Sequence, residues 1–283
     1  MSPKKRTQDP AKVIVIENQK GGVGKTTIAY HLSCYLAEQG YKTLAIDLDG
    51  QGNLSSRFLD RSKRVGGCRS VHLFNDTTPD LKPLDTPDGV DLIYSIDRDV
   101  ELFNVERMDF DKALINFNEN LDPMLDAYDY IVMDTPPAHG NKMSAASITS
   151  NYIFVPVEMA AFAVTGVESV LETLAEIQRY VSDRLQVTGV ICNRLRPVNS
   201  HTEALAELNA AGVNILTARL GTNGAVDDAL RDGVPVWKNK RTGAQRETAK
   251  SMVSLMQEIC GYVGAKIQPP LAKAVAKKSG VTK

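Results

Sequence analysis

Cysteine is scarce in this chain of 283 residues, and its four copies are far apart: Cys34, Cys68, Cys192 and Cys260. No two of them form a C-x-x-C pair, so the sequence indicates neither a zinc site nor a disulfide framework. Paired thiolates that could hold an iron–sulfur cluster at a dimer interface are also missing, and a redox function is not expected. We expect the cysteines to be small apolar core residues.

Long apolar runs are missing as well. No segment reaches the roughly 18 uninterrupted apolar residues of a membrane span, and residues 1–10 carry charges without the apolar stretch of a signal peptide. We therefore expect a soluble, cytoplasmic protein. The sequence has no internal repeat, and its first eleven or so residues are too few for a helix-turn-helix, so sequence-specific operator binding is not expected.

Net charge is nearly absent, at −1, but the charges are unevenly distributed. Residues 236–283 contain ten Lys/Arg against two Asp/Glu, whereas the rest of the chain contains 23 basic and 32 acidic side chains. A basic end on an acidic body favours a surface for polyanions, because clustered cations release counterions from phosphates. A solvated helix face followed by a flexible tail explains the same charges equally well.

A glycine-rich octapeptide, Lys-Gly-Gly-Val-Gly-Lys-Thr-Thr, occupies residues 20–27. It lies between an apolar run at residues 13–16 and a helical pattern that begins near Thr26, which is the strand, loop and helix order of a phosphate-binding loop. The glycines let main-chain N–H groups point toward a phosphate, and the helix N-terminus adds partial positive charge. In such a loop Lys25 reaches the β- and γ-phosphates, and the Thr26 hydroxyl ligates Mg²⁺.

Short apolar segments alternate with helical patterns along the chain, which predicts an α/β fold with a doubly wound, mostly parallel sheet and helices on both faces. The predicted strands are Val13–Glu17, Thr43–Asp47, Asp91–Tyr94, Tyr130–Asp134, Tyr152–Val157, Val187–Cys192 and Val213–Leu216.

Apolar residues at helical spacing predict helices over Val164–Val181 and Thr242–Val263. Two stretches, Arg61–Arg69 and Asn75–Gly89, are predicted to be surface loops. We expect a flexible arm at residues 1–11, one ATPase domain at residues 12–264, and a basic flexible tail at residues 265–283.

The loop and three other segments together resemble the ParA/MinD family of deviant Walker A ATPases, closest to ParA-type partition ATPases, over about residues 12–263. The segments are Asn18–Thr27, Asp47–Asn53, Tyr130–Pro137 and Cys192–Arg194. Gly50 departs from the family pattern, which has proline there. The effect of this change is open; one hypothesis is a looser loop around Asp49 and lower basal hydrolysis, which the turnover of Gly50→Pro would test.

Phosphoryl transfer to water requires cations at the γ-phosphate, a metal and an oriented water. The predicted catalytic residues are Lys20, Lys25 and Asp49, with Asp49 positioning the water by family resemblance. The predicted Mg²⁺ site comprises Thr26, Asp47 and Asp134, where Asp134 acts through water and Asp47 supports the metal and the loop. The alternative for Asp47 and Asp49 is helix capping or loop solvation.

The loop is the predicted phosphate site, and the resemblance implies an asparagine that pairs with the purine edge and an apolar strip over the base. The nucleotide-binding residues are then Gly21, Gly22, Val23, Gly24, Lys25, Thr26, Thr27, Asn193, Pro235 and Val236. The resemblance also places a DNA-binding arginine near Arg219, and the same basic face could be extended by Lys238, Lys240, Arg241, Arg246 and Lys250. The alternative for Arg219 is an ion pair with Asp227 or Asp228.

In the family, the lysine at the Lys20 position crosses a dimer interface to the partner's nucleotide. The resemblance therefore implies an ATPase of low intrinsic rate that forms an ATP-dependent homodimer, binds non-specific DNA on the nucleoid, and is stimulated by a ParB-like adaptor to move a plasmid, chromosome or protein assembly. Two alternatives remain: a MinD-like positioning ATPase on a membrane, although no stable membrane association is expected, or an ATP-dependent metabolic enzyme on the same scaffold.

Overall fold

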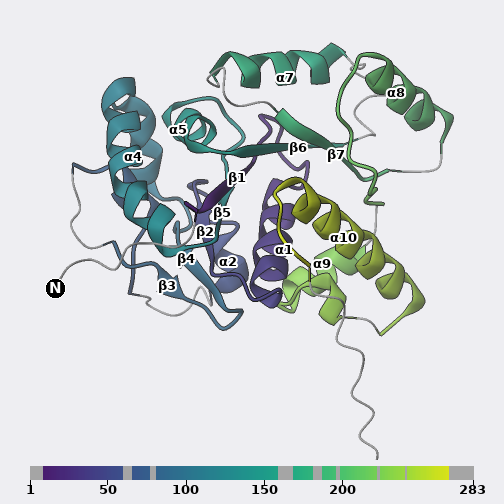
Figure 1. Cartoon of the computed structure of the whole chain (residues 1–283), viewed down its shortest axis with the longest axis horizontal. Coiled ribbons are helices and arrows are strands. Elements are labelled where there is room, and N and C mark those ends of the chain that lie inside the picture. The colour runs from purple at the N-terminus through teal and green to yellow at the C-terminus, as the bar shows by residue number, and fades with distance from the viewer. Residues whose placement is uncertain are drawn as a thin grey trace, which may run out of the picture.

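The computed structural model describes residues 9–59, 66–76, 81–158, 168–180, 187–195, 198–221, 224–239 and 241–267. Within these ranges one seven-stranded sheet has the order β3-β4-β2-β5-β1-β6-β7 (Figure 1). Every neighbouring pair of strands is parallel except β3 with β4. The strands are β1 (Lys12–Ile16), β2 (Thr43–Asp47), β3 (Leu84–Asp85), β4 (Val90–Ile93), β5 (Tyr130–Asp134), β6 (Tyr152–Glu158) and β7 (Val187–Asn193).

Helices cover both faces of this sheet. Figure 1 shows α4, α5, α7 and α8 on one side and α1, α9 and α10 on the other. The helices are α1 (Lys25–Glu38), α2 (Ser55–Phe58), α3 (Val100–Asn104), α4 (Phe110–Ala127), α5 (Asn141–Thr149), α7 (Glu168–Tyr180), α8 (Asn199–Ala210), α9 (Gly224–Arg231) and α10 (Gly243–Tyr262). Three short 3-10 helices are η1 (Ser70–Phe74), η2 (Val105–Arg107) and η3 (Val236–Lys238).

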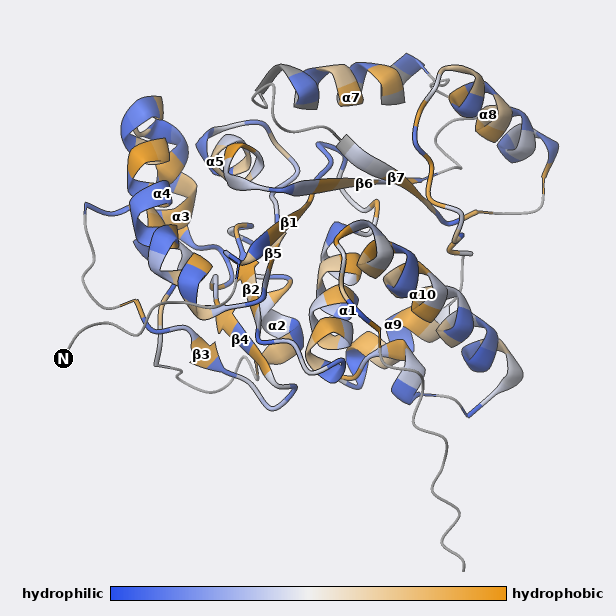
Figure 2. Cartoon of the chain, in the orientation of Figure 1, coloured by the Kyte–Doolittle hydropathy of each residue, from blue (hydrophilic) through white to orange (hydrophobic). Residues whose placement is uncertain are grey.

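The strands supply two hydrophobic cores because successive side chains point to opposite faces. Val13 and Val15 of β1 belong to the core under α4 and α5, whereas Ile14 and Ile16 belong to the core under α1 and α10. Burial on both faces explains why the strands are nearly continuous apolar runs. In Figure 2 the helices α4 and α10 carry hydrophobic as well as hydrophilic residues, as expected for helices with one buried side.

The parallel register brings the carboxyl ends of three strands together. Asp134 at the end of β5 is the register partner of Ile16 in β1 and of Asp47 in β2. The glycine-rich loop leaves β1 at this edge, and α1 begins at Lys25. In open parallel sheets the ligand-binding crevice lies outside the carboxyl ends of the strands, and the residues at this edge form the candidate site.

The predicted fold class is confirmed, and six of the seven predicted strands agree with the structure to within one residue at each end. The helix predicted over Thr242–Val263 is α10, which Thr242 caps by accepting a hydrogen bond from the Gln245 N–H at 3.2 Å. The helix predicted over Val164–Val181 is described only for Glu168–Tyr180, because residues 159–167 and 181 lie outside the described ranges.

Two predictions about the sheet are wrong. The segment Val213–Leu216 is not a strand; it contributes a single parallel bridge between Ile215 and Val190 of β7, because only two main-chain hydrogen bonds join the segments. The loop predicted at Asn75–Gly89 contains β3, a two-residue antiparallel edge strand whose Leu84 pairs with Leu92. Such a short pairing leaves no period-two pattern in the sequence.

Other predictions fall partly outside the described residues. Residues 61–65 of the Arg61–Arg69 loop, residues 1–8 and residues 268–283 are not described, so the proposed domain boundaries remain predictions. All four cysteines are free and buried, as expected for core residues. Among the described helices, none is both long and apolar enough to cross a membrane.

Candidate nucleotide-binding site

The glycine-rich loop is held in a shape that requires glycine. Gly22 and Gly24 have φ angles of 78° and 99°, in the left-handed region that favours glycine. A Cβ atom on Gly24 would lie 2.4 Å from Nδ2 of Asn193. That same Nδ2 donates a hydrogen bond to the Val23 carbonyl at 2.8 Å, so the end of β7 fixes the loop just before α1 begins.

The two lysines of the loop have opposite placements. Lys25 is buried, and its Nζ donates to the Asn18 carbonyl at 2.8 Å and the Lys20 carbonyl at 3.1 Å. Burial lowers the pKa of Lys25, while the nearby charges of Asp134, Asp49 and Glu17 oppose this shift. Lys20 is exposed, and its main-chain N–H donates to Oδ1 of Asn18 at 2.8 Å. The Lys20 side chain does not belong to the lining of the site cavity.

Asp134 lies at the base of the site and has an incomplete set of hydrogen bonds. Its Oδ2 accepts from the Thr26 hydroxyl at 2.6 Å, whereas its buried Oδ1 has no hydrogen-bond partner among the described residues. Burial raises the pKa of Asp134 well above its usual value, and the charge of Asp47 raises it further. A cation beside this oxygen would relieve the penalty of burying an unpaired carboxylate.

Asp47 is fully buried and organises the neighbouring loop. Its Oδ1 accepts from the Asp49 N–H at 3.1 Å, and its Oδ2 accepts from the N–H of Ser55 at 2.8 Å and the hydroxyl of Ser55 at 2.7 Å. Burial raises the pKa of Asp47 to about 7, although the bonds from Ser55 lower it. Asp47 thus contacts the loop through these bonds, and its direct contact with a metal remains a prediction.

Asp49 stands at the edge of the site, in the loop that Asp47 contacts. Asp49 is buried, with 9% of its surface exposed, and it lines the cavity. Its Oδ1 accepts a hydrogen bond from the Gln51 N–H at 3.0 Å. The next residue, Gly50, lies against the ring of Phe103, because a Cβ on Gly50 would be 2.8 Å from two ring atoms. A side chain at this position would require the half-exposed Phe103 ring to shift, and the effect of Gly50 on the loop stays a hypothesis.

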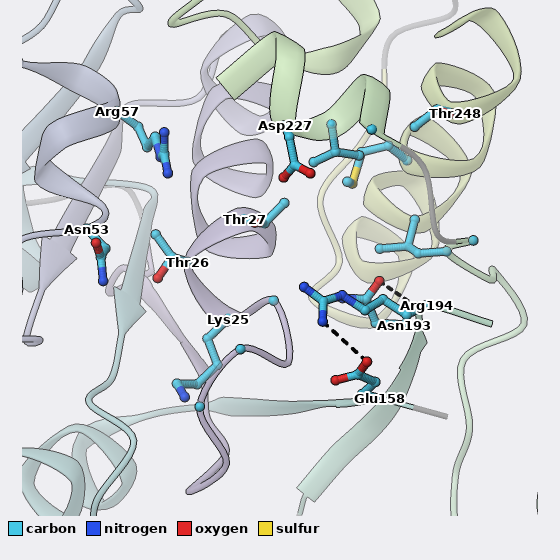
Figure 3. A pocket seen from close by; sticks show the side chains of 18 of the residues that line it. Lys25, Thr26, Thr27, Asn53, Arg57, Glu158, Asn193, Arg194, Asp227 and Thr248 are labelled. Atoms are coloured by element: carbon cyan, nitrogen blue, oxygen red, sulfur yellow. Dashed lines mark hydrogen bonds and ion pairs between the residues drawn. The ribbon is translucent and has the colours of Figure 1, made fainter. Parts of the chain in front are cut away.

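A cavity of about 790 Å³ extends from the glycine-rich loop to α9 and α10. Figure 3 shows Lys25, Thr26 and Thr27 on one side and Asn193 and Arg194 on the other. Apolar side chains in its lining include Leu220, Val226 and Met252. The volume and the mixed lining are typical of a small-molecule site.

The apolar strip predicted from Pro235 and Val236 lies elsewhere. Neither residue lines the described part of the cavity. Val236 is fully buried, and its N–H donates to Nε2 of His31 on α1 at 3.1 Å. Asn193 does line the cavity, and its contact with the purine edge remains a prediction.

Several cavity residues are not identified by the sequence analysis. Glu158 and Arg194 form an ion pair at 3.2 Å, and Arg57 of α2 and Asp227 of α9 also line the cavity (Figure 3). Glu158, Arg57 and Asp227 carry no local signal, because helices and strands far apart in the chain bring them together, whereas Arg194 belongs to the segment Cys192–Arg194 that carries part of the family resemblance.

The candidate DNA-binding residues differ in their contacts and exposure. Lys238 pairs with Glu38 at the end of α1 at 2.9 Å, and Lys250 pairs with Glu247 at 3.5 Å. Arg219 donates to the Ala218 carbonyl at 3.3 Å and has no ion pair among the described residues. The other candidates are Arg241 and Arg246, which are exposed, and Lys240, which lies outside the described residues.

The chain is similar in sequence to several known proteins. The family described as "AAA domain" matches residues 11–187. Protein IncC of Escherichia coli is 30% identical over 266 residues, covering 91% of this chain and 70% of IncC. The chromosome-partitioning ATPase Soj of Treponema pallidum is 28% identical over 263 residues, covering 89% of this chain and 98% of Soj.

Among solved structures, the ATP complex of McdA from Cyanothece has a TM-score of 0.73 at 21% identity, covering 93% of this chain and 100% of McdA. At this identity the likeness supports the fold alone. The shared fold, the family match and the sequence relatives together identify the protein as a P-loop nucleoside triphosphatase. The chain belongs to the ParA/MinD family of P-loop ATPases.

Proposed function

We propose that this ATPase is a partition or positioning switch of the ParA type, in which ATP drives dimerisation, DNA binding and the movement of a cargo. The relatives named Soj and ParA support a role in partition. The single observation that supports the proposed dimerisation is the different placement of the two loop lysines. Lys25 is buried in its own site, whereas Lys20 is exposed and lies outside the cavity lining.

Electrostatic repulsion between two ATP-bound protomers explains why the Lys20 side chain would contact the partner's nucleotide. Two protomers that face each other with bound ATP bring about eight negative charges together, and cations supplied in trans offset this repulsion. The main chain of Lys20 is fixed at both its N–H and its carbonyl. A fixed main chain with an exposed side chain can contribute a cation to a partner with little loss of backbone entropy.

Mg²⁺ fits the residues present. The unpartnered Oδ1 of Asp134 and the Thr26 hydroxyl that contacts the same carboxylate form an oxygen site at the end of β5, and Mg²⁺ prefers oxygen ligands. Thr26 and Asp134 would hold the ion, which neutralises phosphate charge when bound. Lys25 supplies a further cation there, and Asp49 would accept a proton from, or orient, the attacking water.

Nucleotide recognition follows from the cavity. The main-chain N–H groups of residues 21–27 would hold the phosphates, and Asn193 with Leu220, Val226 and Met252 would contact the base. Pro235 and Val236 do not form part of this proposal, because they are not in the described lining of the cavity. DNA is proposed to contact Arg219 and the exposed basic residues of α10, while a ParB-like adaptor would stimulate hydrolysis.

Non-specific duplex DNA provides the direct test. Binding is measured with ATP, with ADP and without nucleotide, over a salt series, for the parent chain, Lys20→Ala, Arg219→Ala and the control Arg107→Ala. Arg107 is an exposed arginine in η2 and is not among the candidate DNA residues. We expect ATP-dependent binding that weakens with salt, is lost in Lys20→Ala and Arg219→Ala, and persists in Arg107→Ala.

The two variants separate the two parts of the mechanism. Lys20→Ala should remain monomeric with ATP in analytical ultracentrifugation, whereas Arg219→Ala should dimerise without binding DNA. If the parent chain shows no DNA binding in any nucleotide state, the DNA-based partition mechanism is wrong, and pelleting with anionic vesicles would then test the membrane alternative.

A further inference from the structure

The loop that carries Asp49 is packed against two segments far along the chain. The ring of Phe103 in α3 lies on Gly50, where an added Cβ would be 2.8 Å from two ring atoms and 3.1 Å from a third. The Gly50 carbonyl accepts from the Asp99 N–H at 2.9 Å. Gly52, with φ of 62°, lies against the main chain at Ser95 and Ile96, because a Cβ there would be 3.0 Å from the Ile96 carbonyl carbon.

The residues around α3 give this contact a rigid base. Asp99 is fully buried, accepts from the Leu102 N–H at 3.1 Å at the start of α3, and pairs with Arg69 at 2.5 Å. A buried charge that caps a helix and is paired resists displacement, since breaking either contact leaves a carboxylate desolvated. The backbone of α3 is therefore fixed relative to the end of the sheet.

A buried lysine on α5 contacts the Phe103 ring. Nζ of Lys142 in α5 lies 5.4 Å from the centre of the Phe103 ring, which is within the range of a cation–π contact. The same Nζ donates to the Leu102 carbonyl at 3.1 Å and pairs with Glu106 at 3.3 Å. α5 is the first helix after Asp134 at the end of β5, so α3 connects the Asp49 loop to the element that follows the proposed metal site.

We propose that Phe103 is a positioning residue for ATP hydrolysis: its ring, in contact with Gly50 and Lys142, keeps the Asp49 carboxylate in place relative to Thr26 and Asp134. The inference rests on the proposed role of Asp49. Phe103 does not belong to the described lining of the cavity. Its removal therefore affects the chemical step through Asp49 and leaves nucleotide affinity intact.

Phe103→Ala is compared with Phe110→Ala, a matched control. The two residues are 41% and 43% exposed, and Phe110 lies at the start of α4. We expect Phe103→Ala to lower turnover at saturating ATP by about tenfold, because a displacement of about 1 Å in a catalytic group can cost about a hundredfold. Affinity for a non-hydrolysable ATP analogue should remain within about twofold of the parent. Phe103→Leu should restore part of the turnover, and Phe110→Ala should match the parent.

Gly50→Ala tests the packing itself. The backbone of Gly50 lies outside the left-handed region, so the obstacle to the added carbon is the contact with Phe103. Gly50→Ala should reduce turnover in the parent chain and have little further effect when combined with Phe103→Ala, which is the coupling expected of residues in contact. Additive losses in the double variant would overturn the packing argument.

Asp49→Asn separates this inference from the proposed function. If Asp49→Asn abolishes turnover while Phe103→Ala behaves like Phe110→Ala, then Asp49 acts as proposed and the positioning role of Phe103 is wrong. If Asp49→Asn turns over like the parent, both the role of Asp49 and the inference built on it fail. Loss of analogue binding in Phe103→Ala equal to its loss of turnover would also overturn the positioning role.

Discussion

Gly24→Ala should destabilise the fold far more than the same change three residues earlier. An alanine at Gly24 would have to adopt a φ of 99°, and its Cβ would lie 2.4 Å from Nδ2 of Asn193. A left-handed non-glycine residue costs about 1–2 kcal/mol. Displacing Asn193 also breaks its hydrogen bond to Val23, worth about 1 kcal/mol. We expect a total loss of about 2–3 kcal/mol in the free energy of unfolding, from the sum of these two effects.

Gly21→Ala is the matched control for this prediction. The φ angle of Gly21 is outside the left-handed region, and a Cβ there would have no neighbour within 4 Å. Its effect on stability should be within about 0.5 kcal/mol. Urea unfolding without nucleotide measures folding alone, so the loss of phosphate contacts does not enter the comparison.

A double variant separates the two causes of the loss. In Gly24→Ala combined with Asn193→Ala, the collision disappears and the backbone strain remains, so the combined loss should be smaller than the sum of the single losses. If Gly24→Ala unfolds at the same urea concentration as Gly21→Ala, the argument from φ and from the close contact is refuted.

Three further predictions concern a buried histidine, a helix cap and the proposed metal site. Burial lowers the pKa of His31 to about 4, so this side chain contributes about 2 kcal/mol less to stability at pH 5 than at pH 7.5. The raised pKa values of Glu17 and Asp47 act in the opposite direction, so the test compares two chains: on going from pH 7.5 to pH 5, the parent should change by about 2 kcal/mol more toward unfolding than His31→Gln does in urea unfolding. Thr242→Ala removes the cap of α10 and should cost about 1 kcal/mol in urea unfolding, whereas an equal result for Ser254→Ala within α10 would contradict this. Thr26→Ala should abolish Mg²⁺-dependent turnover, and full turnover in an ATPase assay would exclude Thr26 as a ligand.

The sequence by itself determined the phosphate-binding loop, most of the strands and the polar residues at the strand ends. The octapeptide at residues 20–27, the apolar strands and the carboxylates that follow them were readable because each is a local pattern with a fixed spacing. Thr26 and Asp134 were predicted from the loop and the strand end, Asp49 and Asn193 were predicted from the family resemblance, and the structure brings all four to one edge of the sheet. Local patterns suffice where the backbone of one segment forms the site.

Only the tertiary structure decided which residues enclose the rest of the cavity. Val226 and Met252 lie on different helices, so no spacing in the sequence links them, whereas Val236 packs beside His31. The same is true of Gly50 and Phe103, which are distant in the chain and lie against each other in the fold. Contacts between distant segments depend on how helices pack on the sheet, and packing is a property of the whole fold.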